Sequence, residues 1–373
     1  VDGTAPSGAP VEWVEEPSYF FNLSKWEDKL LKFYEENNNF ILPNSRRNEV
    51  ISFVKGGLKD LSISRTSFSW GIKVPNNSSH IMYVWLDALT NYLTALNWHN
   101  DGKDFNTFWP CNLHIVGKDI LRFHAVYWPA FLMAADLPLP SRVFAHGWWT
   151  NEGQKISKSI GNVIDPIALV KKYGLDQTRY FLMREVPFGR DGDFSEAAMI
   201  TRTNSDLAND LGNLSQRTLS LIVKNCEGKI PALPTTLCDD DRALLDAGDR
   251  LLDQVRLQFD QQAFHEGLRQ IWEVIAAANR YIDTQAPWVL KKTDIQRMEE
   301  VLAVLVETIR QIIILVQPVM PHSANKLLNQ LMIPEEHRDF SFIGGKSRNS
   351  AGIIIAKPQG VFPRYQDAEG EGA

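Results

Sequence analysis

The sequence predicts an α/β domain followed by an all-α helix bundle. Between about residues 70 and 190, apolar runs of strand length alternate with segments of helix length, a pattern typical of a parallel sheet covered by helices. Beyond Phe194, long helical patterns follow one another and are separated by pairs of prolines. We therefore expect a separate helix bundle from about 195 to 335.

The first 70 residues mix an extended start with two helices. The segment LSKWEDKLLKFYEEN has the alternation of apolar and charged residues that an amphipathic helix needs. A second helix is expected around Asn48 to Gly56.

The sheet itself is predicted from three apolar runs: HIMYVWLDA, NLHIVGKD and RVFAHGWWT. A buried helix, ILRFHAVYWPAFLMAADL, follows the second run. After the third run, Asp165 and Pro166 predict the start of another helix, with the aspartate as N-cap and the proline in the first turn.

Composition limits the classes of protein that are compatible with the sequence. The 373 residues, 44% hydrophobic and 23% charged, suffice for two or three compact units. A net charge of -6 excludes a uniformly basic coat for nucleic acid, although a local basic stripe remains compatible with it. Cys111, Cys226 and Cys238 show no CxxC spacing, so we expect reduced thiols and no structural zinc.

The most apolar window, from Val301 to Met320, contains Glu307 and Arg310 and ends at a proline pair. We expect it to be a buried helix and not a membrane span. The chain shows no secretory segment, so we expect a cytoplasmic protein, with an organelle matrix as the alternative.

The stretch GQKISKSIGN places two lysines in a glycine-flanked loop after the third predicted strand. A lysine on a mobile loop can follow a phosphate as its charge develops, and it suits a triphosphate because it acts as a point charge. The alternative for such a loop is an ordinary solvated surface loop.

A histidine on the predicted buried helix is the second candidate for chemistry. At helical spacing, Ile120, His124 and Trp128 share one face, and the preceding strand ends in GKD. Ligands of parallel sheets bind at the carboxyl ends of the strands. A histidine on an apolar helix can also be a satisfied core residue, so this alternative stays open.

Six segments together resemble the class I methionyl-tRNA synthetases of bacterial or organellar type. They occur in the family's order and extend over nearly the whole chain. The segments are YVWLDA (83–88), GKDILRFH (117–124), HGWWT (146–150), KISKS (155–159), GNVIDP (161–166) and NRYIDTQAPW (279–288).

The resemblance also shows a departure from the family pattern. The family's first signature, a His-Ile-Gly-His-type tetrad, has no counterpart in this sequence, nor have the cysteine pairs of its zinc knuckle. The resemblance therefore implies a fragment that lacks the N-terminal half of the catalytic domain. We expect that missing half to be a partner of the chain, and we expect the chain alone to be incomplete as an enzyme.

The implied domains are the end of the connective insertion and the start of the second catalytic half (1–70), the second half of a Rossmann-like catalytic domain (71–194), a helical anticodon-binding domain (195–335) and a C-terminal segment (336–373). We expect the last segment to pack back on another domain, because AGIIIAKPQGVFPRY is too apolar for a loose tail. Its polar end is expected to be frayed.

The implied activity is ATP-dependent activation of L-methionine to methionyl-adenylate and its transfer to tRNA(Met), with Mg²⁺ accompanying the ATP. By resemblance, Lys155 and Lys158 are catalytic, because they bind the triphosphate and stabilise the transition state and the departing pyrophosphate. A general base is not needed, since the attacking carboxylate is already ionised. The other implied ATP-binding residues are Ser157, Gly117, Asp119 and Trp149.

The resemblance also implies a methionine pocket and an anticodon site. The pocket should have aromatic walls for contact with sulfur, and the anticodon site should stack an unpaired base on an exposed indole. Plain core packing is the alternative for each pocket aromatic, and a solvated helix face is the alternative for the anticodon residues. The implied pocket consists of Trp85, Ala88, Leu89, Tyr92, Ile120, His124 and Trp128, and the anticodon site of Asn213, Arg217 and Trp288.

Two other functions compete with this interpretation. A class I synthetase for leucine, isoleucine or valine usually carries a large editing domain, for which the segment before residue 70 leaves no room. A non-catalytic tRNA-binding protein would explain the absent first signature. However, such a protein would have little reason to keep both KISKS and GKDILRFH.

Overall fold

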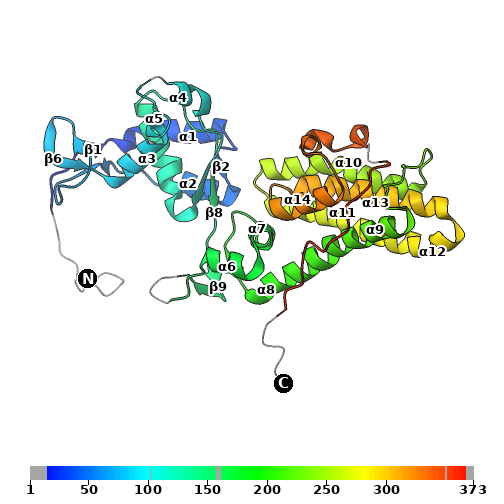
Figure 1. Cartoon of the computed structure of the whole chain (residues 1–373). Helices are drawn as coiled ribbons and strands as arrows, with labels where there is room; N and C mark the ends of the chain where they lie inside the picture. The colour runs from blue at the N-terminus through cyan, green and yellow to red at the C-terminus, as the bar shows by residue number, and fades with distance from the viewer. Residues whose placement is uncertain (1–14, 101, 157–160, 349–350, 367–373) are drawn as a thin grey trace. The chain divides into compact units, whose positions relative to one another are not determined.

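The structure is a computed structural model that describes residues 15–100, 102–156, 161–348 and 351–366, except for the side chains of Lys155 and Lys346. It divides into two compact units, Val1–Trp148 and Trp149–Ala373. Figure 1 labels the elements of both units. The boundary between the two units lies within the third predicted strand.

The first unit contains the parallel sheet that the sequence predicts. Strands β2 (Ile41–Leu42), β8 (Val143–His146) and β7 (His114–Gly117) lie side by side in that order, and both pairs are parallel. In the register of the pair β7–β8, Gly117 lies opposite His146. The carboxyl ends of these two strands therefore meet at one edge of the sheet.

Short antiparallel strands and helices complete the first unit. The antiparallel pairs are β1–β3, β4–β6 and β5–β6. Both helices expected before residue 70 are present. The bounds are β1 Phe20–Phe21, η1 Leu23–Trp26, α1 Glu27–Glu36, α2 Asn44–Lys55, β3 Leu61–Ser62, β4 Ser64–Arg65, β5 Lys73–Val74, β6 Asn77–Met82, α3 Val84–Thr94, α4 Lys103–Phe108, η2 Lys118–Ile120, η3 Phe123–Tyr127 and α5 Trp128–Ala134.

Two of the expected strands are only partly strands. HIMYVWLDA is extended as far as Met82, and its second half opens α3. Tyr83 is the extended N-cap residue, and Asp87 lies in the first turn, where a negative charge stabilises a helix. RVFAHGWWT is divided between β8 and β9 (Trp149–Asn151), which belong to different sheets.

The second unit starts with a small sheet and continues as the expected helix bundle. β9 pairs antiparallel with β10 (Gln154–Lys155) and parallel with β11 (Gly192–Phe194). Asp165 caps α6 as predicted, because its carboxylate accepts a hydrogen bond from the backbone N–H of Ile167 at 2.9 Å. The helices up to the bundle are α6 Pro166–Tyr173, α7 Leu175–Arg184, α8 Glu196–Thr201 and η4 Arg202–Gly212.

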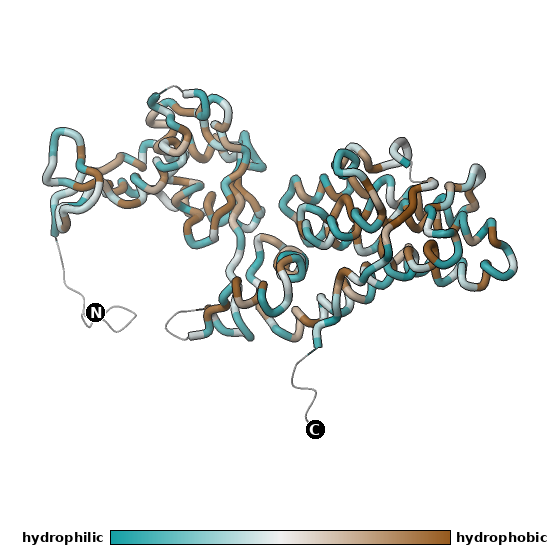
Figure 2. The backbone as a smooth tube through the Cα atoms, in the orientation of Figure 1, coloured by the Kyte–Doolittle hydropathy of each residue, from teal (hydrophilic) through white to brown (hydrophobic). Residues whose placement is uncertain are grey.

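The bundle helices lie side by side in Figure 1 around one apolar core. Apolar and polar stretches alternate along them in Figure 2, as expected for amphipathic helices. They are α9 Asn213–Asn225, α10 Asp239–Asp260, α11 Phe264–Gln285, α12 Pro287–Thr293, α13 Ile295–Val316 and α14 Pro321–Gln330, followed by the turns η5 Glu335–His337, η6 Phe340–Phe342 and η7 Gly345–Ser347.

The most apolar helix, α13, is the buried helix that the sequence predicts. Its Glu307 and Arg310 are each 3% exposed and form a two-pronged ion pair with N–O distances of 2.7 and 2.9 Å, so neither charge is buried alone. Among the described residues, no helix is both long and apolar enough to cross a membrane.

The described part of the C-terminal segment packs on the bundle. Ile355 and Phe362 are buried in the bundle core, and Ile354 pairs with Lys229 in an isolated β-bridge. The polar end from residue 367 lies outside the described residues.

Candidate functional site

Helix α3 carries four of the residues predicted for the amino-acid pocket. Trp85, Ala88, Leu89 and Tyr92 follow one another at intervals that keep them on one side of a helix. Leu89 is 1% exposed and packs in a core cluster, Trp85 and Tyr92 are half-buried, and Ala88 is exposed. The core-packing alternative therefore fits Leu89 best, and the two aromatic residues retain accessible surface.

The opposite wall is not the regular helix that the sequence predicts. Residues Phe123–Tyr127 form a π-helical turn (η3) before α5. Pro129 explains this local change, because it has no N–H for the carbonyl of Ala125, four residues earlier. That carbonyl accepts a hydrogen bond from the hydroxyl of Tyr34 at 2.5 Å instead. Turns of this type are frequent at functional sites.

The two walls meet through aromatic contacts. The rings of Trp85 and Phe123 are stacked, with centroids 3.6 Å apart and an interplanar angle of 12°. Tyr92 lies against Trp128, which is 2% exposed, with centroids 6.1 Å apart. Of the predicted residues, Ile120 packs against a different cluster. Its carbonyl oxygen nevertheless lies 3.0 Å from Nδ1 of His124.

His124 fixes the direction of the Tyr92 hydroxyl. Its Nδ1 lies 3.0 Å from the carbonyl oxygen of Ile120, which can only accept, so Nδ1 carries a hydrogen. Burial lowers the pKa of His124, and the neutral ring therefore has a lone pair on Nε2. The Tyr92 hydroxyl, 2.8 Å away, donates to that lone pair. The wall thus presents neutral groups, which suit an apolar side chain.

A second neutral histidine lies behind Tyr92. His114 is 6% exposed, and its ring centroid is 4.4 Å from that of Tyr92. Burial and the nearby His124 lower the pKa of His114 to about 4. Its Nε2 is 3.4 Å from Sγ of Cys111, and burial raises the pKa of that thiol to about 11. All these groups are therefore uncharged at neutral pH.

The sequence did not single out Phe123, His114 or Cys111. Phe123 lies within the quoted segment GKDILRFH, directly before His124, and the inward alternation of β7 could have indicated His114. Cys111 lies only three positions before His114, and its contact with that imidazole is therefore local in the sequence.

Gly117 and Asp119, predicted to bind ATP, lie together at the carboxyl end of β7, where Gly117 is the last residue of the strand and Asp119 belongs to the following turn η2. A Cβ atom on Gly117 would be 2.5 Å from Oδ1 of Asp119, so a larger residue here would require the Asp119 side chain to move. The exposed Asp119 accepts a hydrogen bond from the indole N–H of Trp148 at 3.3 Å. Lys118 places its ammonium group 4.2 Å from the centroid of the same indole. Trp148 thus also belongs to the group of side chains at the carboxyl end of β7.

The lysine-rich loop begins on a tight hairpin of the second unit. In the pair β9–β10, Thr150 lies opposite the backbone of Lys155. Glu152 and Gly153 between them have φ of 48° and 76°, as a two-residue hairpin turn requires. The Asn151 amide donates to the carbonyl of Asn162 at 3.0 Å, which ties the far end of the loop to β9.

All the groups predicted to bind the phosphates lie outside the described residues. They are Ser157, Lys158 and the side chain of Lys155. Trp149, predicted to contact adenine through its backbone, is half-buried in β9, with its ring centroid 6.0 Å from that of Phe181.

The helix bundle brings together two of the three predicted RNA-binding residues. The guanidinium of Arg217 on α9 lies 5.2 Å from the ring centroid of Trp288 on α12. Its Nη2 donates to Oδ1 of Asp283 at 2.8 Å. Trp288 keeps 38% of its surface exposed. Asn213 is exposed one turn before Arg217 and makes none of the described side-chain hydrogen bonds.

The described residues contain no group of three or more His, Cys, Asp or Glu side chains placed to hold a metal ion. The three cysteines are free thiols.

Comparison with known families identifies the class to which both sites belong. A family model described as "tRNA synthetases class I (M)" matches residues 4–219, and one described as "Anticodon binding domain of methionyl tRNA ligase" matches 230–372. The protein is therefore a class I aminoacyl-tRNA ligase, with a catalytic domain followed by a helical anticodon-binding domain.

Similar proteins of known family narrow this class further. The chain is 58% identical over 364 residues to the methionine–tRNA ligase of Brucella suis, covering 98% of this chain and 70% of that protein. It is 56% identical to the enzyme of Rickettsia conorii, covering 98% and 72%. The structure of Mycobacterium tuberculosis methionyl-tRNA synthetase in complex with methionyl-adenylate matches with a TM-score of 0.93 and 52% identity, covering 98% and 72%. The chain belongs to the methionyl-tRNA synthetase family.

These matches cover nearly all of this chain and about 70% of the relatives. They give no support to the further expectation that a missing N-terminal half is a partner of the chain.

Proposed function

We propose that the first unit binds L-methionine between α3 and the η3–α5 wall. The observation that supports this most is the hydrogen-bonded pair Tyr92–His124, framed by the stacked rings of Trp85 and Phe123. Stacked aromatic rings offer flat apolar surface and favourable contacts to sulfur. Because the pair is neutral, it does not force a charge against the thioether. The enzyme of M. tuberculosis with a similar fold binds methionyl-adenylate.

The bound methionine is activated with MgATP as the second substrate. A carboxylate oxygen of methionine forms a bond to the α-phosphorus of ATP, and the bond between that phosphorus and the bridging oxygen breaks. Pyrophosphate leaves with the bonding electrons, and no proton has to be removed. Gly117, Asp119 and Trp149 are proposed to hold the nucleotide, and Lys155, Ser157 and Lys158 to bind its phosphates. In the second step, a hydroxyl of the terminal adenosine of tRNA attacks the methionyl carbonyl, and AMP leaves.

The lysines are proposed to act in the transition state. Negative charge grows on the bridging oxygen and on the departing phosphates, and ammonium groups on a loop can follow it. The β9–β10 hairpin holds the start of this loop, and the Asn151–Asn162 hydrogen bond holds its end.

Trp288, Arg217 and Asn213 are proposed to read the CAU anticodon of tRNA(Met). An exposed indole can stack on an unpaired base, and neighbouring amide and guanidinium groups can donate to base edges or phosphate. The contact between Arg217 and Trp288 supports a joint role, because the two side chains come from different helices. We propose the cytoplasm as the compartment, in line with the bacterial relatives.

Methionine-dependent ATP–pyrophosphate exchange tests the catalytic part of this proposal. Since the relatives are longer than this chain, the exchange is measured with the chain alone and with the additional part of a relative supplied in trans. Lys158→Ala should slow the exchange about a hundred- to a thousandfold, the usual effect of losing one transition-state donor, with unchanged methionine affinity. A Lys158→Ala variant that weakens only methionine binding would contradict the assignment of this lysine to the phosphates.

A further inference from the structure

A buried carboxylate joins three helices of the bundle close to Trp288. Asp241, in the first turn of α10, is 0% exposed. Arg297 of α13 donates to both of its oxygens at 2.7 Å, and the hydroxyl of Tyr281 on α11 donates to Oδ1 at 2.5 Å. Burial by itself would raise the pKa of Asp241, but the hydrogen bonds from Arg297 and Tyr281 lower it to about 2. The carboxylate is thus ionised, and it holds Arg297 in a fixed orientation.

Arg297 extends this network to the end of α11. Its Nη2 also donates to Oε1 of Gln285 at 2.9 Å. The amide nitrogen of Gln285 donates to Oδ2 of Asp240 at 2.9 Å. Both ends of this amide are therefore held, and the last residue of α11 is tied to α10 and α13.

Gln285 directly precedes the turn that carries Trp288. Ala286 has φ 44° and ψ 61°, a left-handed conformation that residues other than glycine rarely adopt. The buried Pro287 then begins α12, and Trp288 follows it. Such a conformation persists only when the surrounding structure enforces it. The direction in which Trp288 leaves the bundle therefore depends on the contacts that hold this turn.

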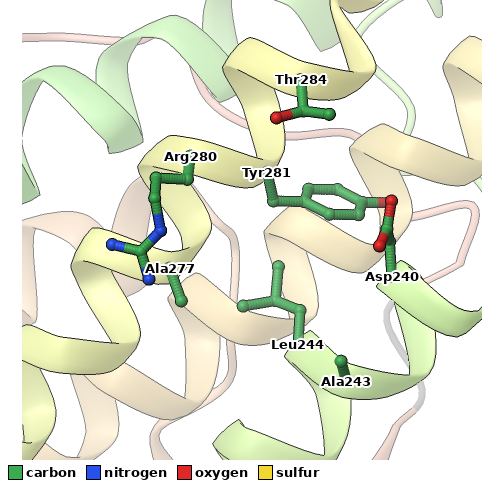
Figure 3. A pocket seen from close by; sticks show the side chains of 7 residues that line it. All are labelled: Asp240, Ala243, Leu244, Ala277, Arg280, Tyr281 and Thr284. Carbon is green, nitrogen blue, oxygen red and sulfur yellow. The ribbon is translucent and has the colours of Figure 1, made fainter.

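The network borders accessible surface and does not lie in the centre of the core. A depression of about 260 Å³ between α10 and α11 is lined by Asp240 and Tyr281. Figure 3 shows the Tyr281 ring reaching from α11 toward the start of α10 at this depression. Nothing on the described surface indicates a ligand for the depression itself.

We propose that Arg297, anchored on Asp241, is a positioning residue for tRNA recognition: through Gln285 it fixes the turn that presents Trp288 beside Arg217. Arg297 acts through Gln285 and does not touch the RNA. This inference rests on the proposed anticodon role of Trp288.

The test removes the bridge and leaves the buried ion pair in place. Gln285→Leu keeps the size of the side chain but has neither donor nor acceptor, and Asp241, Arg297 and Tyr281 keep their mutual contacts. The matched control is Gln296→Leu. This glutamine is exposed on α13, and its amide donates to Glu300 at 3.3 Å.

Binding of tRNA(Met) is measured by fluorescence anisotropy at a temperature well below the melting midpoint of each variant. Gln285→Leu should weaken binding about fivefold to twentyfold, a part of the loss expected when base stacking is removed entirely. Gln296→Leu should stay within about twofold of the wild type, since an exposed glutamine contributes little.

A second readout reports on the indole in the absence of RNA. The protein is labelled with 5-fluorotryptophan, and the ¹⁹F resonance of Trp288 is assigned with Trp288→Phe. The resonance should shift or broaden in Gln285→Leu and remain unchanged in Gln296→Leu. A general loss of stability below the midpoint would not move this one resonance selectively.

The outcomes separate this inference from the function on which it rests. If Trp288→Ala binds tRNA like the wild type, the proposed anticodon role fails. If Trp288→Ala weakens binding but Gln285→Leu changes neither affinity nor the Trp288 resonance, the positioning role alone is refuted. A loss of affinity in Gln285→Leu that occurs only where the protein is unfolded refutes it as well.

Discussion

Replacing Trp288 by alanine should impair tRNA binding and leave methionine binding intact. Trp288 is 38% exposed, so much of one indole surface can accept a base. Stacking of one base contributes about 1–3 kcal/mol, which corresponds to about a five- to 150-fold loss of affinity. The contact between Arg217 and the indole is present without RNA. Trp288→Ala removes this contact from the free and the bound protein alike, so the contact adds little to the expected loss of tRNA affinity.

The assay compares tRNA(Met) with the same tRNA carrying an altered anticodon. In the wild type, the altered tRNA should bind more weakly, and Trp288→Ala should reduce this discrimination. Trp70→Ala is the matched control, because Trp70 is 88% exposed and belongs to the first unit. Equal losses for both tRNAs, or an equal effect of Trp70→Ala, would refute base stacking on Trp288. A loss of methionine affinity in Trp288→Ala would instead indicate a general structural defect.

Three further predictions concern the first unit and the anticodon surface. Tyr92→Phe leaves the buried Nε2 of His124 without its donor, which costs about 1–3 kcal/mol, so the melting midpoint should fall by several degrees. The control is Tyr127→Phe, which should keep the midpoint near the wild-type value because the Tyr127 hydroxyl has no described hydrogen bond. Burial lowers the pKa of His114 from 6.5 to about 4, so its contribution of about 3 kcal/mol to the free energy of unfolding is fully present above pH 6.5 and is lost as the pH falls toward 4. Urea unfolding between pH 4 and 7 should show this loss, and His114→Gln should flatten the dependence of the unfolding free energy on pH. Arg217→Ala should weaken tRNA binding and, if the guanidinium contacts phosphate, reduce the slope of affinity against salt by about one; an unchanged affinity at low salt would exclude Arg217 from the interface.

Local signals predicted the elements that depend on neighbouring residues. Asp165 and Pro166 are adjacent, and the aspartate cap forms as their order predicts. The helix bundle followed from amphipathic periodicity, and Trp288 is exposed because Pro287 starts a new helix at that point.

VWLDALT is apolar enough for a strand, but it becomes helical because the neighbouring Tyr83 and Asp87 provide a helix start, a local signal that the prediction did not use. Other features depend on partners that are distant in the sequence. The π-helical turn before α5 depends on Pro129 and also on Tyr34. The hydroxyl of Tyr34 donates to the carbonyl of Ala125, which lies 91 residues later in the sequence.

The candidate sites also depend on contacts between distant residues, which the sequence does not indicate. The quoted segments contain Trp85 and His124, but the stacking of Trp85 on Phe123 requires two helices to pack together. The network around Asp241 joins residues up to 56 positions apart, and no spacing in the sequence indicates it.

The central claim is that the aromatic pocket of the first unit selects methionine, and calorimetric titration of Trp85→Ala tests it most directly. Removing the indole takes away one apolar wall and the stacked partner of Phe123. The expected cost is about 1.5–3 kcal/mol, or about a ten- to 150-fold loss of methionine affinity. The wild-type chain should bind methionine more tightly than leucine, and the variant should lose most of this preference. Equal affinities for methionine and leucine in the wild type, or unchanged methionine affinity in Trp85→Ala, would contradict the account.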